Sequence, residues 1–131
     1  KRLVKRIVGV PGDTIYMQNN TLVINSVPAN YEVLSRDAES IIIQEELPGG
    51  AHQARLSSRY VNRSSRSYGP TVVPADQYFV LGDNRDNSAD SRIYSFVPRG
   101  EIIGRSSSVV FSLDSHNNYL PRGERFLAEL E

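Results

Sequence analysis

Residues 77–92 read QYFVLGDNRDNSADSR, in which an apolar and aromatic pentapeptide runs directly into eleven residues with almost no apolar content. The first five residues have the aromatic and β-branched composition of a buried strand. The polar part begins at Gly82 and mixes acidic, amide and basic side chains as far as Arg92. Polar loops that a rigid strand positions are frequent sites of function, and this stretch predicts such a loop.

Period-two patterning and β-branched residues dominate the rest of the chain, which predicts a mainly β fold. In residues 1–10 the alternation places Leu3, Lys5 and Ile7 on one face, before Pro11-Gly12-Asp13 ends the strand. Further strands are predicted at 14–17, 21–24, 31–34, 40–44, 51–56, 101–104 and 107–113, and residues 126–130 are expected to form a strand or a helical turn.

Length and composition restrict the class of protein. The 131 residues suffice for one domain, or two small ones, with a real core. Fifteen basic and 15 acidic residues cancel, so no net field attracts nucleic acid or an acidic membrane surface. Without cysteine there is no disulfide and no Cys-ligated zinc, and no apolar run is long enough to span a bilayer. The chain starts without Met and in strand-like sequence, which predicts a fragment with its upstream part removed.

The Asp and Asn residues of the polar loop suggest a calcium site, but their spacing does not fit an EF-hand. A loop starting at Asp83 puts Arg85 at the third ligand position, and one starting at Asp86 puts Val97 where the bidentate Glu belongs. His52 and His116 form no ligand-spaced pair. We therefore expect surface histidines, no metal and no cofactor.

Residues 57–68 are rich in Ser and Arg, which suggests nucleic-acid binding. However, the segment has only three arginines among its twelve residues and lacks the aromatic ladder of RNA-binding surfaces. Its composition favours a solvated, disordered loop.

Lysine is rare in this chain, because 13 of the 15 basic residues are arginine and only Lys1 and Lys5 are lysine. Lys5 shares a strand face with Leu3 and Ile7, and a lysine held among aliphatic side chains loses hydration, which lowers its pKa. A neutral lysine can act as a general base. From the strand alone, the alternative is a surface lysine whose charge protects an edge strand from aggregation.

The lysine strand and the polar loop together resemble two sequence boxes of the bacterial type I signal peptidases, or leader peptidases. The resemblance covers Lys5-Arg6-Ile7-Val8-Gly9-Val10-Pro11-Gly12-Asp13 and residues 77–92, in the right order, and extends to residues 46–50, 96–98 and 103–105. It implies a Ser-Lys protease in which Lys5 is the general base. The family's nucleophilic serine lies upstream of the lysine, in a Ser-Met-x-Pro segment after the membrane anchor, so no serine of this chain should replace it.

The resemblance also implies roles for other residues. Ser88 matches a serine whose hydroxyl orients the lysine amine, and Asp90 and Arg92 match a charge pair that supports the loop. The supporting set further includes Asp83, Asn84, Asn87 and Arg6. Leu3 and Val4 are expected to wall small-residue pockets for the Ala-x-Ala end of a preprotein that adds to their strand. Where the family often has Trp-Gly after the Asp-Ser-Arg triplet, this chain has Ile93-Tyr94-Ser95.

The implied protein is a serine endopeptidase that removes N-terminal signal peptides from exported preproteins and has no nucleic-acid partner. It is anchored in the bacterial cytoplasmic membrane by a segment missing here, with this part on the outer side. The implied architecture has two antiparallel β regions, a small catalytic core of residues 1–13 with 78–117 and a larger region of residues 14–77 with 118–131.

This fragment alone is expected to be inactive, because the nucleophile lies upstream of it. Two alternatives stay open. One is a catalytically silent, signal-peptidase-like interaction module, and the other is a nucleic-acid-binding β-barrel that rests on the Arg/Ser segment.

Overall fold

The computed structural model describes residues 2–59, 66–105 and 109–112. Most of them lie in strands, as the sequence predicts, and no helix in these ranges is long and apolar enough to cross a membrane. In chain order the elements are β1 (Arg2–Gly9), β2 (Thr14–Gln18), β3 (Thr21–Ile24), β4 (Val27–Pro28), β5 (Asn30–Arg36), β6 (Ser40–Leu47), β7 (Gly50–Ser57), β8 (Tyr68–Val72), β9 (Gln77–Leu81), α1 (Ser91–Tyr94), β10 (Val97–Pro98), the 3₁₀ turn η2 (Arg99–Glu101), β11 (Ile102–Arg105) and β12 (Val109–Ser112).

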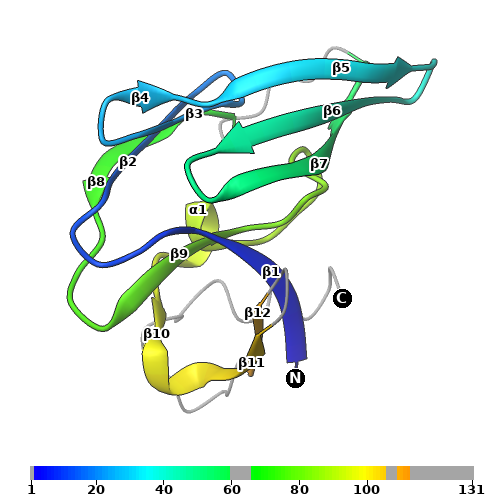
Figure 1. The fold of residues 1–131 in the computed structure, drawn as a ribbon. Coiled ribbons are helices and arrows are strands. Elements are labelled where there is room, and N and C mark those ends of the chain that lie inside the picture. The colour runs from blue at the N-terminus through cyan, green and yellow to red at the C-terminus, as the bar shows by residue number, and fades with distance from the viewer. Residues whose placement is uncertain (1, 60–65, 106–108, 113–131) are drawn as a thin grey trace.

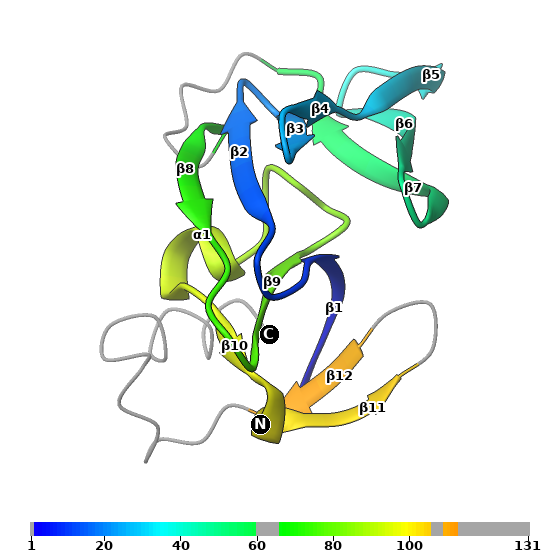
Figure 2. The ribbon, with the colours of Figure 1, turned by 60° about the vertical axis from the view of Figure 1, so that its left-hand side comes forward.

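The strands form three antiparallel sheets (Figures 1 and 2). One has the order β10-β9-β1-β12-β11, the second β4-β3-β2-β8 and the third β5-β6-β7. The resemblance implies two β regions, and the larger of these contains two sheets because β5, β6 and β7 form a meander with its own hydrogen-bond ladders. The proposed division into two units stays a prediction. Residues 113–131, with the element expected at 126–130, lie outside the described ranges.

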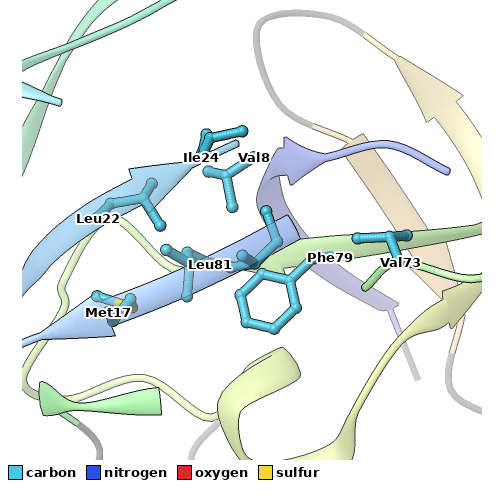
Figure 3. Close-up of a cluster of buried hydrophobic side chains, with 8 residues drawn as sticks. Val8, Met17, Leu22, Ile24, Val73, Phe79 and Leu81 are labelled. Carbon is cyan, nitrogen blue, oxygen red and sulfur yellow. The ribbon is translucent and has the colours of Figure 1, made fainter. Parts of the chain in front are cut away.

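The main core lies where β1, β2, β3 and β9 meet (Figure 3). Burial alternates along β2 and β3, so every second side chain faces this core. The ring of Phe79 is wholly buried, with the rings of Tyr68 and Phe96 at centroid distances of 5.2 and 6.1 Å. The complete cluster of buried hydrophobic side chains consists of Val8, Ile15, Met17, Leu22, Ile24, Val73, Phe79 and Leu81.

β8 and α1 do not follow from the sequence patterns, and neither do the short elements β4, β10 and η2. β8 contains Gly69-Pro70, which is more typical of a turn. The strand lies at the edge of its sheet, where a proline without an N–H donor is tolerated. α1 is a single turn that begins after Asp90, whose side chain accepts a hydrogen bond from the Arg92 N–H as an N-cap does.

β1 changes its partner halfway along its length. Residues 2–5 pair with β12, whereas β9 pairs with β1 only from Arg6 onward. Within the described ranges, the edge of Leu3 and Val4 on the β9 side therefore has no partner strand. The side chain of Val4 is 64% exposed. Lys5 lies at the changeover, beside the point where the chain leaves β9 and enters the polar loop.

Candidate active site

Lys5 and Ser88 are 83 residues apart in the chain and meet at the end of β9. The Lys5 Nζ donates a hydrogen bond to the Ser88 Oγ at 3.0 Å, and both residues are half-buried. The strand register explains the meeting, because Arg6 pairs with Leu81 and the loop therefore starts next to Lys5. The structure thus brings together the two residues for which the sequence predicts a catalytic role.

Gly82 makes room for this contact. A Cβ atom at Gly82 would lie 1.9 Å from the Ser88 Oγ, 2.6 Å from the Ser88 Cβ and 3.2 Å from the Lys5 Nζ. Distances below 3.0 Å are not compatible with ordinary packing. Sequence reasoning did not single out Gly82, although its place at the junction of strand and loop is where a close backbone approach is expected of glycine.

Asp90, near the end of the polar loop, binds Gly82 at the start of the loop. Its buried carboxylate accepts from the Gly82 N–H at 2.9 Å and from the Nε and Nη2 of Arg92 at 2.9 and 2.8 Å. The next residue, Ser91, accepts from the Val80 N–H through its hydroxyl at 2.8 Å. The expected contact between Asp90 and Arg92 is therefore present, and it connects the two ends of the loop.

The other predicted supporting residues contribute in different ways. Arg6 donates two hydrogen bonds, both 3.0 Å long, to the carboxylate of Asp83. Asn84 and Asn87 are exposed and shape the loop through the main chain, where the Asn87 N–H donates to the Asn84 carbonyl at 3.0 Å.

Arg85 was not predicted to be a site residue, yet it is 1% exposed and binds a wholly buried carboxylate, that of Glu45 on β6. Glu45 also accepts from the Tyr31 hydroxyl at 2.6 Å, and its Oε1 lies 2.7 Å from the Nε2 of His52. The expectation of a surface histidine is wrong for His52, because the pairing of β6 with β7 places it opposite Glu45 with a side chain only 9% exposed. His116 lies outside the described ranges.

The polar partners of Glu45 decide its charge. Burial alone would raise the pKa of the Glu45 carboxyl, but hydrogen bonds from His52, Arg85 and Tyr31 hold this pKa well below its ordinary range. Burial and the neighbouring Glu45 carboxylate raise the pKa of Tyr31. Around neutral pH the cluster therefore holds a carboxylate, a guanidinium and a neutral phenol.

Asp86 anchors the loop in a second direction. Its buried carboxylate accepts from the Nε and Nη2 of Arg66 at 2.8 and 2.7 Å, from the Nδ2 of Asn20 at 3.1 Å and from the Ser57 N–H at 2.7 Å. The Arg66 side chain is therefore half-buried and ion-paired, in contrast to the solvated loop expected for the Arg/Ser segment. Residues 60–65 of that segment lie outside the described ranges.

A cavity of about 540 Å³ lies beside the second half of β1 and the β6–β7 turn, lined in part by Arg6, Ile7, Leu47 and His52. Neither Lys5 nor Ser88 lines it. In the described part of the chain, no group of three or more His, Asp or Glu side chains is arranged to hold a metal ion.

Comparison with known proteins identifies the family of this chain. Residues 1–111 match the model of the family described as "Signal peptidase, peptidase S26". Signal peptidase I P of Bacillus subtilis subsp. natto is 38% identical over 112 residues, which cover 85% of this chain and 52% of the relative. Signal peptidase I S of Bacillus subtilis strain 168 is 37% identical over 109 residues, or 82% of this chain and 51% of the relative.

A crystal structure of a signal peptidase I from Enterococcus faecalis V583 is 30% identical and covers 73% of this chain and 74% of that one, with a TM-score of 0.42. The chain spans about half the length of the two Bacillus relatives. The family model covers most of the chain, including both the lysine strand and the polar loop. The chain therefore belongs to the S26 family of signal peptidases.

Proposed function

We propose that this chain is part of a type I signal peptidase, a serine endopeptidase that removes N-terminal signal peptides from preproteins, with Lys5 as its general base. The observation that supports this most strongly is the 3.0 Å contact between the Lys5 Nζ and the Ser88 Oγ, on a loop built around Gly82. An amine held at a fixed position by a hydroxyl is suited to take a proton from a nucleophile.

The proposed nucleophile is a serine upstream of Lys1, in the full-length protein. Its Oγ attacks the carbonyl carbon at the end of the signal peptide while the neutral Lys5 amine accepts the hydroxyl proton. The proton then passes to the amine of the leaving mature chain, and the acyl-enzyme forms. Water attacks the ester, Lys5 accepts the proton of that water and returns it to the serine, and the signal peptide is released.

Ser88 orients the amine in this mechanism and does not attack the substrate. Its Oγ is held close to Gly82, where it accepts the hydrogen bond from the Lys5 Nζ and fills the space that a Cβ at Gly82 would need. The Ser88 hydroxyl accepts the Lys5 hydrogen bond, so the lone pair of the neutral amine is left to point elsewhere.

The substrate binds as an added strand on β1. The edge of Leu3 and Val4 on the β9 side carries no partner strand from the described ranges, and it ends at Lys5. The exposed Val4 side chain offers apolar surface at this edge. Main-chain hydrogen bonds to such an edge hold a peptide extended, and shallow pockets select small side chains of the Ala-x-Ala type.

The enzyme works at the outer side of the bacterial cytoplasmic membrane, held by an N-terminal anchor outside this chain. Support comes from the resemblance alone, since signal peptides are cleaved where they emerge from that membrane. The division of the chain into a catalytic core and a second β region, at the boundaries predicted from sequence, belongs to the same proposal.

The proposal is tested by incubating the full-length protein, in detergent, with a preprotein that carries an Ala-x-Ala signal peptide. We expect one product whose N-terminus follows the second alanine, as determined by N-terminal sequencing. Lys5→Arg should abolish the cleavage although it keeps the positive charge, because guanidinium does not lose its proton near neutral pH. A Lys5→Arg protein with near-normal turnover would remove Lys5 from the role of base, and a wild-type protein without cleavage would favour a silent interaction module.

A further inference from the structure

A carboxylate from the three-stranded sheet reaches the loop that carries Ser88. Glu45 on β6 is wholly buried, and its two oxygens accept from the Nη1 and Nη2 of Arg85 at 2.8 and 2.7 Å. A fork-shaped pair of charge-assisted hydrogen bonds fixes the plane of the guanidinium as well as its distance. The position of Arg85 is therefore set from outside the loop, by a residue 40 positions earlier in the chain.

Arg85 carries this constraint to Gly82. Its Nε donates to the Gly82 carbonyl at 2.9 Å, while the Gly82 N–H donates to the Asp90 carboxylate at 2.9 Å. The peptide groups on both sides of the Gly82 α-carbon are thus held. This is the α-carbon against which the Ser88 hydroxyl packs, and any movement of it changes the space in which the Lys5 amine and Ser88 meet.

The neighbouring strand β7 supports the same docking through its main chain. The Arg55 N–H donates to the Asp83 carbonyl at 2.7 Å, and the Arg55 carbonyl accepts from the Arg85 N–H at 2.9 Å. The loop is therefore laid along the three-stranded sheet as a short parallel bridge. Glu45 adds the side-chain part of this contact through its two hydrogen bonds from Arg85.

The other partners of Glu45 keep its carboxylate in place. Tyr31 on β5 donates to one oxygen at 2.6 Å, and the Nε2 of His52 on β7 lies 2.7 Å from the other. Each strand of the sheet thus contributes one residue to the cluster. Loss of the carboxylate leaves the buried Arg85 guanidinium without its counter-charge, so the guanidinium must shift toward water or toward another acceptor.

We propose that Glu45 is a positioning residue for the Lys5–Ser88 pair, acting through Arg85 and the carbonyl of Gly82. The proposal rests on the proposed function, because it gives Glu45 a part in the same proton transfer. Glu45 itself contacts neither Lys5 nor Ser88 in any hydrogen bond described above. A shift of about 1 Å in a positioned catalytic group costs on the order of a hundredfold in rate, so a small relaxation of the loop has a measurable effect.

The test compares Glu45→Gln with Glu46→Gln in the full-length protein. Glu46 is the adjacent residue of β6, is exposed and binds Asn30 at the surface, so it controls for the loss of one charge from this strand. For Glu45→Gln we expect kcat on a preprotein to fall about tenfold to a hundredfold, with KM within about twofold. The acidic limb of the kcat profile should also move by about half a pH unit or more, because the surroundings of the base change.

Arg85→Lys should show the same separation of kcat from KM, since lysine keeps the charge but lacks the Nε donor to Gly82. Rates are expressed per folded molecule, with the folded fraction taken from near-ultraviolet circular dichroism. If Glu45→Gln does not fold, Glu45→Asp, which keeps the charge and retracts it by one methylene, replaces it.

A Glu45 variant with unchanged kcat and pH profile per folded molecule would overturn the proposal, and so would an equal loss in Glu46→Gln. Lys5→Arg in the same assay distinguishes a failure of the positioning role of Glu45 from a failure of the proposed function. If Lys5→Arg is inactive and the Glu45 variants are normal, only the positioning role fails. If Lys5→Arg is active, the proposed function itself fails.

Discussion

Substitution of Gly82 by alanine tests the packing around the Lys5–Ser88 pair. The added methyl group would lie 1.9 Å from the Ser88 Oγ and 2.6 Å from the Ser88 Cβ, whereas non-bonded heavy atoms pack at about 3.5 Å or more. The Ser88 Oγ must therefore retreat by about 1.6 Å, the difference between about 3.5 Å and 1.9 Å. The Gly82 peptide cannot move instead without breaking its hydrogen bonds to Asp90 and Arg85.

A displacement of about 1 Å costs about a hundredfold in rate, so Gly82→Ala should lower kcat by about a hundredfold or more. The free energy of unfolding should fall by only about 1–3 kcal/mol, the usual cost of an added methyl group in a packed site. The assay measures kcat and KM of the full-length enzyme on a preprotein, with urea denaturation alongside. Gly49→Ala is the control, because a Cβ at that position meets nothing within 4 Å. A Gly82→Ala enzyme with kcat within threefold of wild type, and folded, would refute the reasoning about the pair.

Three further predictions concern the loop and its anchors. Ser88→Ala should keep measurable preprotein cleavage at a kcat lowered on the order of a hundredfold, because the base is misplaced and not removed. Asp83→Asn should lower the free energy of unfolding by less than about 1 kcal/mol in urea titrations, since its ion pair with Arg6 is partly exposed. The pKa values of Glu45 and Asp86 are lowered in the folded state, in spite of burial, by their hydrogen-bond partners. These carboxylates therefore stabilise the fold fully above their ordinary pKa values, and the midpoint of thermal unfolding should decline as the pH falls below about 4.5, with a smaller decline in Asp86→Asn.

Sequence patterns relate residues that are close together in the chain, and they therefore predict features within single strands and loops. Strand alternation predicts β1, β2 and β3 to within a residue or so, because a strand with one buried face has an apolar side chain at every second position. The apolar and aromatic composition of residues 77–81 predicts β9, whose last three residues are all buried. The Asp90–Arg92 contact joins residues two positions apart. The meeting of Lys5 with Ser88 came from a family resemblance, since no pattern within one strand fixes which loop lies beside it.

The Glu45 cluster could not be found in this way. Glu45 stands next to Glu46, and it is the burial in the folded chain that shows which carboxylate faces inward: Glu45 is wholly buried and Glu46 is exposed. A one-residue change of register exchanges the two faces of a strand. His52 was expected on the surface for the same reason, and β8 was missed because its Gly-Pro pair is acceptable only at the sheet edge, which depends on the whole topology.

The central claim is that a serine upstream of Lys1 is the nucleophile, that Lys5 is its base and that Ser88 only orients Lys5. The most direct test is to locate the serine that an inhibitor modifies covalently. The full-length enzyme is incubated with a serine-directed acylating inhibitor, digested, and the adduct is located by mass spectrometry. We predict an adduct on a serine upstream of Lys1 in wild type and in Ser88→Ala, and none in Lys5→Arg, where no base accepts the serine proton. An adduct on Ser88, or an unchanged yield of adduct in Lys5→Arg, would contradict the account.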